Sequence, residues 1–266
     1  MILAFDIGNT NSKIALAEGE TILHQWRVTT NARFTDTEYI SILEPLFKES
    51  EVDFKTIEYA VISSVVPQLT KTFMLVNRHF TGKKAVLISP EIYGLLPVKI
   101  PESAVHEIGT DLLCDAVEAW CRYKQAAITV NFGTALSFTA IDQNGTIAGI
   151  AIAPGIKTAL KSLFTDTAQI PYVPLEAPPS SLGKSTTLAV QSGIVLGYTG
   201  LVESMIERMK NDLHAETGAE VEKITVIATG GLSGIVKPGR DVFNYIDRNL
   251  TMLGIIRAGL YAVHEI

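Results

Sequence analysis

The sequence predicts an α/β protein of two related domains, each a mixed β-sheet flanked by helices in the order βββαβα. Two runs predict strands, residues 2–5 and 128–130, and the first is continuously apolar, as expected for a strand that is buried on both faces. Each run ends in a polar turn that contains glycine, and an apolar strand resumes after each turn. The repetition of this unit indicates two half-molecules, which we place at residues 1–113 and 114–266.

The first turn carries the residue types that bind a phosphate group. It comprises Asp6 at the strand end, followed by Ile7, Gly8, Asn9, Thr10, Asn11, Ser12 and Lys13. Glycine lets backbone N–H groups approach an anion, hydroxyl and amide side chains donate hydrogen bonds, and lysine adds positive charge. The carboxylate of Asp6 is suited to hold Mg²⁺, directly or through water. The alternative is a hairpin whose turn residues serve conformation alone.

A second turn repeats the order of the first. Asn131, Phe132, Gly133 and Thr134 again give a polar residue, a spacer, a glycine and a hydroxyl or amide side chain. Gly-Thr turns are common, so coincidence stays open as an explanation. A third glycine turn at residues 229–231 follows another apolar run and leaves room for a flat ligand or a phosphate. Together the three turns indicate a nucleotide held between two domains.

The composition argues against several classes of protein. The chain has 266 residues, of which 47% are apolar, enough for two medium domains with full cores. No apolar run approaches the ~20 residues that span a bilayer and no signal peptide is recognisable, so we expect a soluble cytoplasmic protein with no membrane partner. The net charge is −6 and basic residues are not clustered, so we expect no nucleic-acid partner.

The cysteines and histidines predict neither a disulfide nor a zinc site. Cys114 and Cys121 lie seven residues apart in one predicted helix. At ~1.5 Å rise per residue they are separated by ~10 Å, which is too far for a disulfide. There is no CxxC motif, and the 5 histidines are scattered along the chain.

The remaining elements of the first half follow in the order βββαβαβ. After the hairpin, the pattern predicts a strand over 21–28, a capped helix over 35–51, a strand over 59–64, a helix over 67–80 and a strand over 85–88. A helix over 112–124 follows a loop that contains Gly109, Thr110 and Asp111. Spacing alone leaves two interpretations open: Thr110 or Asp111 is simply the N-cap of that helix, or Asp111 presents a functional carboxylate to the loop.

The second half repeats the plan. Strands begin at residues 127, 136 and 146, and a helix follows over 156–163. Residues 171–179 are rich in proline and predict an extended surface loop. The polar segment 180–187 either covers a ligand or caps the long helical run over 188–213. A strand over 223–229, the glycine turn and a helix over 250–263 complete the unit.

Seven motifs in this order resemble those of type III pantothenate kinases. They are DIGNTNSK, WRVTT, GTD, NFGTA, APGIKTAL, GKSTTLAVQSGIVLGY and VIATGGL. The resemblance covers nearly the whole chain and implies the acetate and sugar kinase/Hsp70/actin fold, which is ribonuclease H-like, and a homodimer. It implies ATP-dependent phosphorylation of pantothenate, the first step of coenzyme A biosynthesis. It also implies Mg²⁺ and a monovalent cation, K⁺ or NH₄⁺.

Carried over by position, the resemblance implies a role for each matching residue. Residues 6–13 would bind ATP together with Gly133 and Thr134. Asp111 would be the proton acceptor, and pantothenate would contact Gly109, Thr110, Asp111, Leu112 and Thr186. Asn131 falls at the monovalent-cation site. An ordinary aspartate is ionised at neutral pH and can orient and deprotonate a primary hydroxyl without a raised pKa.

Three positions depart from the family pattern. Leu112 replaces an arginine whose charge-assisted bond is typically worth ~1.5–3 kcal/mol, so substrate affinity should fall roughly ten- to a hundredfold unless another group such as Lys184 replaces it. Asn131 replaces an aspartate, which removes a unit charge and predicts a weak or absent dependence on the monovalent cation. The aromatic residue that the family has shortly before GTD is absent at residues 100–102.

These departures leave two alternative functions open. In the first, the chain phosphorylates a different small hydroxylated acceptor, because Leu112 lies on the substrate side of the predicted site. In the second, it is a non-catalytic nucleotide-binding accessory protein of the same fold. The retention of Asp6 and Asp111 argues against the second alternative.

Overall fold

The computed structural model describes residues 1–165, 172–235 and 242–264. The chain forms two compact units, Met1–Glu118 with Leu250–Ile266, and Ala119–Asn249. This division differs from residues 1–113 and 114–266 because the last helix, α7 (Leu250–His264), packs on strands of the first unit. The first boundary falls inside helix α3 (Thr110–Tyr123).

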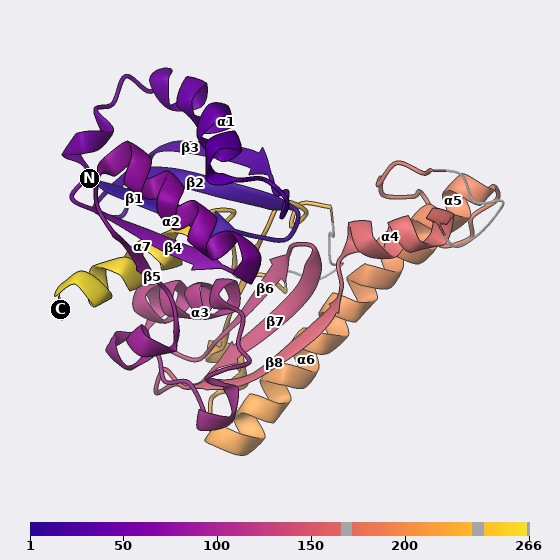
Figure 1. The fold of residues 1–266 in the computed structure, drawn as a ribbon. Coiled ribbons are helices and arrows are strands. Elements are labelled where there is room, and N and C mark those ends of the chain that lie inside the picture. The colour runs from indigo at the N-terminus through magenta and orange to yellow at the C-terminus, as the bar shows by residue number, and fades with distance from the viewer. Residues whose placement is uncertain (166–171, 236–241, 265–266) are drawn as a thin grey trace. The chain divides into compact units, whose positions relative to one another are not determined.

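The first unit contains a five-stranded mixed sheet in the order β3-β2-β1-β4-β5 (Figure 1). β1 is antiparallel to β2 and parallel to β4, as the hairpin and the following helix predict. Helices α1 (Asp36–Lys48) and α2 (Pro67–Thr81) contribute to one core cluster on the sheet, and α7 contacts β1 and β4. The strands are β1 (Ile2–Ile7), β2 (Asn11–Glu18), β3 (Thr21–Thr29), β4 (Tyr59–Ser64) and β5 (Ala85–Leu87).

The sheet of the second unit has the same topology. Its order is β10-β9-β6-β7-β8, with the unit's first strand, β6, in the centre, antiparallel to β7 and parallel to β9. This duplication confirms the predicted two-domain α/β architecture. The strands are β6 (Ala127–Phe132), β7 (Ala135–Ile141), β8 (Ile147–Pro154), β9 (Thr225–Thr229) and β10 (Tyr245–Ile246). The two-residue β10 was not predicted, because its residues show no extended apolar run.

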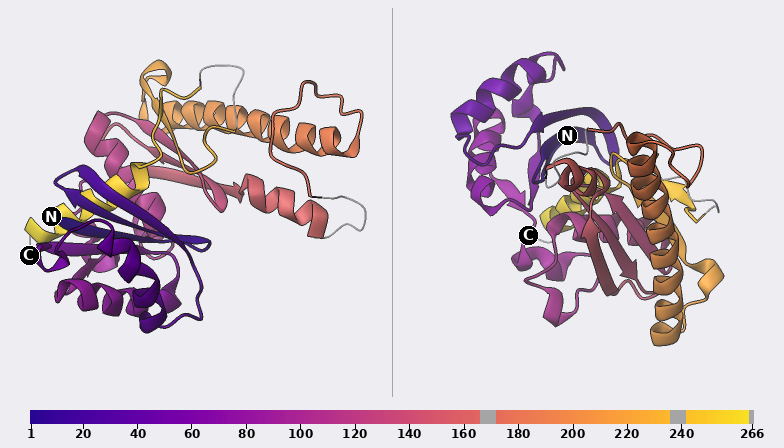
Figure 2. Two further views of the ribbon diagram at one scale, coloured as in Figure 1. Left: turned by 90° about the horizontal axis from the view of Figure 1, so that it is seen from above. Right: turned by 90° about the vertical axis from the view of Figure 1, so that its right-hand side faces the viewer.

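The helices of the second unit include α4 (Ile156–Thr165), α5 (Thr186–Gln191) and the long α6 (Gly197–Thr217), which runs along the sheet (Figures 1 and 2). Residues 192–196 between α5 and α6 are π-helical, so the predicted run over 188–213 is helical but not uniformly α. The Ser185 side chain accepts a hydrogen bond from the Leu188 N–H, which supports the capping interpretation of this polar segment.

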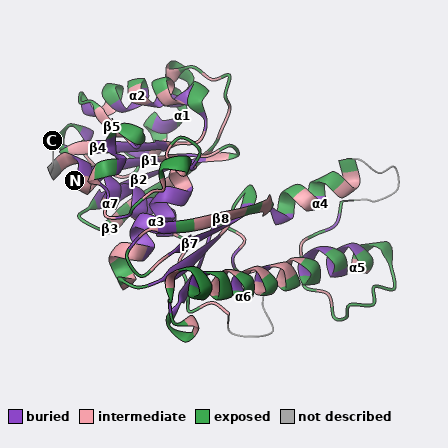
Figure 3. Ribbon diagram, turned by 90° about the horizontal axis from the view of Figure 1, so that it is seen from below, coloured by how far each residue is buried: buried purple, intermediate pink, exposed green. Residues whose placement is uncertain are grey.

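The central strands are buried on both faces, as their continuous apolar sequence predicts (Figure 3). In β1, Leu3, Phe5 and Ile7 pack with Tyr39 of α1 and Phe73 of α2. Ile2 and Ala4 alternate with them and are also buried, on the opposite face of the sheet. This continuous burial fixes the register of β1 and therefore the place where Asp6 emerges at the strand end.

Two further findings bear on the predicted classes of site. Within the described parts of the chain, no helix combines the length and apolarity of a membrane span. Cys114 and Cys121 are not joined by a disulfide.

The predicted helix over 35–51 begins after Thr35, whose side chain forms a capping box with Glu38.

We predict that Gly254→Ala lowers the free energy of unfolding. A side chain at position 254 of α7 would overlap the carbonyl oxygen of Cys114 in α3, so the two helices must separate. Overpacking of this kind typically costs ~1–3 kcal/mol. Gly200→Ala is the matched control, because nothing surrounds this position of α6 and alanine there should stabilise by ~0.5–1 kcal/mol. Urea denaturation of both variants measures the difference, and equal midpoints would contradict close α3–α7 packing.

Candidate active site

The carboxyl ends of β1 and β4 place the first group of predicted site residues. Asp6 is in register with Lys13 of β2 on one side and with Ser63 of β4 on the other. The Lys13 ammonium lies 3.7 Å from an Asp6 carboxylate oxygen. The Asp6 side chain is only 13% exposed, so this is a largely buried ion pair at a sheet edge.

The turn after β1 is held by hydrogen bonds within the hairpin and from the end of β3. The Gly8 N–H donates to the Asn11 carbonyl oxygen over 3.2 Å. The Thr30 hydroxyl donates to the Gly8 carbonyl oxygen over 2.7 Å, and the Thr30 N–H donates to the Thr10 carbonyl oxygen over 3.0 Å. Thr30 was not predicted as a site residue, although it closes the motif WRVTT.

The side chains of this turn differ in their accessibility. Ile7 and Ser12 are buried, and the Ser12 hydroxyl is 2.9 Å from that of Thr30. Asn9 and Thr10 are exposed. The turn therefore offers Asn9, Thr10 and backbone groups to a ligand, while Ile7 can contribute only through its backbone.

Helix α3 begins at Thr110, so Asp111 lies within its first turn rather than before it. One Asp111 carboxylate oxygen accepts the Leu112 N–H over 2.9 Å. A side chain at Gly109 would lie 2.6 Å from the same carboxylate oxygen, so glycine makes room for the carboxylate to fold back. The Leu112 side chain is only 7% exposed and is therefore buried in the protein interior.

Burial changes the acidity of both carboxyl groups. The pKa of Asp6 is raised from 3.8 to about 6, mainly by burial, with Lys13 opposing the rise and the negative charge of Asp111 adding to it. Burial also raises the pKa of Asp111, against the hydrogen bond from the Leu112 N–H and the charge of Lys13. Because Asp111 acts on the pKa of Asp6 and Lys13 acts on the pKa of both carboxyl groups, the three charged groups lie near one another in the first unit.

This arrangement fits a magnesium ion that is shared with a phosphate. Carboxylate oxygens are the protein ligands that Mg²⁺ prefers, and the ion commonly keeps water and substrate phosphates in its remaining positions. Among the described residues, no three His, Cys, Asp or Glu side chains form a metal cluster. Asp6 therefore fits as a single protein ligand rather than as part of a closed metal site.

In the second unit, the β6–β7 turn presents Gly133 and Thr134, which are both exposed. The Thr134 carbonyl oxygen accepts the Gly155 N–H over 3.1 Å and the Thr158 hydroxyl over 2.8 Å. A side chain at Gly155 would overlap that carbonyl oxygen. The start of α4 thus holds the turn from behind and leaves its outer side accessible.

The glycine turn after β9 has a structural reason that the sequence did not reveal. Gly230 has φ +91°, and a side chain there would lie 2.6 Å from the Phe132 carbonyl oxygen. The space at Gly230 is therefore filled by the backbone of β6 and is not left for a ligand. Gly231 faces open space, so only this second glycine keeps the predicted room.

Asn131 lies in the row of residues that crosses the centre of the second sheet. Its partners in register are Ser137 of β7 and Thr229 of β9. The Thr229 hydroxyl is buried and has no hydrogen-bond partner among the residues that the structure describes. An amide oxygen and an unsatisfied hydroxyl oxygen on adjacent strands suit a weakly bound monovalent cation better than a divalent one.

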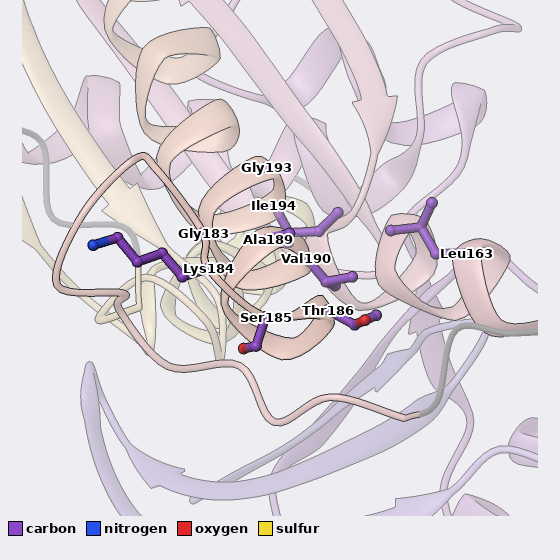
Figure 4. A pocket seen from close by; sticks show the side chains of 9 residues that line it. All are labelled: Leu163, Gly183, Lys184, Ser185, Thr186, Ala189, Val190, Gly193 and Ile194. Atoms are coloured by element: carbon purple, nitrogen blue, oxygen red, sulfur yellow. The ribbon is translucent and has the colours of Figure 1, made fainter.

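Thr186 lies on a pocket of about 580 Å³ in the second unit. The pocket is formed by Leu163 of α4, by the loop around Lys184 and by α5 with the π-helical segment (Figure 4). The Lys184 side chain points away from Leu163 (Figure 4). None of the lining residues belongs to the β6–β7 turn, so the second unit carries two separate groups of predicted site residues.

Comparison with known proteins relates most of the chain to one family. Residues 2–208 match the family model described as type III pantothenate kinase. A type III pantothenate kinase from Treponema pallidum (strain Nichols) is 40% identical over 259 residues, which cover 96% of this chain and 92% of that protein. One from Syntrophotalea carbinolica is 33% identical over 255 residues, and 96% of each chain is covered.

A solved structure supports the fold. The activator of the 2-hydroxyisocaproyl-CoA dehydratase from Clostridium difficile with bound ADPNP aligns with a TM-score of 0.51 and 16% identity. The alignment covers 99% of this chain and 94% of that one. The two-domain fold with one mixed sheet in each domain is the actin-like fold that the resemblance implied.

We predict that the pKa of Asp6, measured by carboxyl ¹³C NMR, is about 6. Lys13→Met should raise it further because the opposing positive charge is lost, and Asp111→Asn should lower it because a negative charge is removed. Because the pKa of Asp6 is higher in the folded protein than the ordinary value of 3.8, proton binding to Asp6 favours the folded state. This contribution to stability is complete below pH 3.8 and is lost as the pH rises through about 6. A wild-type value near 3.8 would show that Asp6 is solvated.

Proposed function

Because the chain belongs to the type III pantothenate kinase family, we propose that Asp6, Lys13 and Asp111 form the centre of its active site. The family's activity is the ATP-dependent phosphorylation of pantothenate to 4′-phosphopantothenate, the first step of coenzyme A biosynthesis. The observation that carries the assignment of residues is the buried acidic pair beside Lys13 at the carboxyl edge of β1 and β4. An enzyme that consumes ATP is expected in the cytoplasm.

In this proposal, each part of the site has a separate task. The turn from Asp6 to Lys13, with Gly133 and Thr134, binds the phosphates of ATP through backbone N–H groups and short polar side chains. Asp6 would hold Mg²⁺, which when bound would supply positive charge to the phosphates. The turn from Gly109 to Leu112 and Thr186 contact pantothenate.

Asp111 is the proton acceptor for the transfer. The primary hydroxyl oxygen of pantothenate bonds to the γ-phosphorus, the bond from that phosphorus to the β–γ bridging oxygen breaks, and the hydroxyl proton passes to Asp111. Burial raises the pKa of Asp111 toward neutrality, which makes its carboxylate a better base. The hydrogen bond from the Leu112 N–H keeps that carboxylate in place.

The monovalent cation is proposed to bind weakly at Asn131. Its amide oxygen is a neutral ligand, and the unsatisfied Thr229 hydroxyl on the adjacent strand is a second oxygen. Without a carboxylate, the site lacks the charge that would offset loss of cation hydration. K⁺ or NH₄⁺ should therefore have less effect than in a relative that has an aspartate there.

A homodimer is proposed on the basis of exposed apolar side chains in the second unit. Ile152, Tyr172 and Leu182 are 67%, 74% and 77% exposed, values that are unusual for large apolar residues. Leu196 of the π-helical segment is 38% exposed. A second copy of the chain would cover such a surface.

Asp111→Asn should lower kcat by ~10²–10⁴-fold, because the amide cannot accept the proton. Gly109→Ala should lower kcat at least ~10-fold while the melting temperature stays close to wild type, because the new methyl group displaces only the Asp111 carboxylate. Gly94→Ala is the control, since nothing lies near that glycine. A coupled assay of ADP release with pantothenate measures all three. If Asp111→Asn turned over at the wild-type rate, Asp111 would be excluded as the proton acceptor.

Asn131→Asp should increase the activation by K⁺, because it restores a negative charge to the proposed cation site. We expect the wild type to be activated less than about twofold between zero and saturating K⁺, and the variant about tenfold, corresponding to ~1.4 kcal/mol. Na⁺ at equal ionic strength is the control for salt effects. Strong activation of the wild type, unaltered in the variant, would place the cation elsewhere.

Sedimentation equilibrium should give twice the chain mass of 28.8 kDa for the wild type. Leu182→Asp should shift the molecule toward the monomer, because it places a charge in the proposed interface. Leu75→Asp changes an apolar residue of the first unit that is 42% exposed and should leave the dimer intact. A monomeric wild type would refute the dimer.

A further inference from the structure

Ser63 is a buried residue beside the active site to which no role has been assigned. It lies on β4 in register with Asp6 of β1 and is 1% exposed. Its hydroxyl oxygen is 2.8 Å from the Thr110 hydroxyl oxygen. It also shares a side-chain hydrogen bond with the Cys114 thiol. One serine thus contacts two residues of α3 from the strand that lies next to Asp6.

These two contacts lie on either side of Asp111. Thr110 and Cys114 are four residues apart, so they occupy the same face of α3 one turn apart, and Asp111 belongs to the turn between them. The hydrogen bonds that the Asp111 carboxylate accepts from the described backbone are local, from the Leu112 N–H and from its own N–H. These local bonds orient the carboxylate relative to its own helix but do not fix the helix relative to β1.

A second element, α7, also contacts this part of α3. Gly254 approaches the Cys114 backbone so closely that no side chain fits between them. The first turns of α3 are therefore held by both a strand and a helix, through the Ser63 hydroxyl and through close backbone packing. Displacement of α3 requires either the loss of the Ser63 hydrogen bonds or a shift of α7.

We propose that Ser63 is a positioning residue for phosphoryl transfer, whose hydroxyl holds the first turn of α3 so that Asp111 remains beside Asp6. The inference rests on the proposed role of Asp111. A buried hydroxyl needs hydrogen-bond partners, whereas an apolar side chain at the same position would not. The hydroxyl of Ser63 finds its partners in α3, which indicates a functional role for these hydrogen bonds. Displacement of a reacting group by about 1 Å can reduce turnover ~10²-fold.

The neighbouring Ser64 is the matched control. It precedes α2, and its hydroxyl bonds to the backbone of Val66, over 3.2 Å from the N–H and over 3.1 Å to the carbonyl oxygen. These bonds serve the start of α2 and do not reach α3. Ser64→Ala removes the same atom from the adjacent residue without affecting the hydrogen bonds between Ser63 and α3.

The kinetic test combines Ser63→Ala with changes at Thr110. Ser63→Ala should lower kcat about ten- to a hundredfold and change KM for ATP less than about twofold, while Ser64→Ala stays near wild type. Thr110→Val should lose activity, and Thr110→Ser should retain it because the hydroxyl is preserved. If Ser63 acts through Thr110, the Ser63→Ala/Thr110→Val double variant should be no slower than the slower single variant. Multiplied losses in the double variant would overturn the proposal.

Hydrogen exchange gives a readout that does not depend on the reaction. Ser63→Ala should increase amide exchange in residues 110–117 by about tenfold or more relative to both wild type and Ser64→Ala, at similar melting temperatures. Unchanged amide exchange and an unchanged kcat in Ser63→Ala would refute the proposed positioning role of Ser63. Absence of wild-type turnover with pantothenate would instead refute the proposed function, and the exchange result would still decide whether Ser63 holds α3.

Discussion

The site depends on two largely buried carboxylates, that of Asp6 at the carboxyl end of β1 and that of Asp111 in the first turn of α3. Both lose hydration, and the negative charge of Asp111 further disfavours the charged form of Asp6. Lys13 and the Leu112 N–H offset part of this effect. A bound cation and its phosphate would complete the compensation. Glycine at position 109 is required in this arrangement, because a side chain there would displace the Asp111 carboxylate.

The fold delivers these groups to one edge through strand direction. β1 and β4 are parallel, so their carboxyl ends coincide, and the hairpin returns Lys13 beside Asp6. The second unit repeats the topology and places Asn131 at the equivalent position of its first strand, with Gly133 and Thr134 in the following turn. One arrangement of strands thus gives two polar turns of different charge. The acidic copy is suited to a divalent cation and the neutral copy to a weakly held monovalent one.

The sequence predicted the elements whose signals are local. The apolar runs located β1 and β4, and a capping residue located the start of α1. Contacts between distant segments could not be predicted in this way. The Thr30 hydroxyl that supports the first turn, the Ser63 hydrogen bond to α3 and the packing of α7 on the first unit all join residues whose proximity the topology creates. Gly230 was recognised as part of a turn, but its need to approach β6 appears only in three dimensions.

The identity of the phosphorylated product tests the central claim most directly. The enzyme would be incubated with MgATP and pantothenate, or with each of a panel of other small hydroxylated acids and amides, and the product analysed by ³¹P NMR. The account predicts one new phosphomonoester, on the primary hydroxyl of pantothenate, formed in step with ADP and absent with Asp111→Asn. A phosphoester formed only with a different acceptor, or ATP binding without any phosphorylated product, would contradict it.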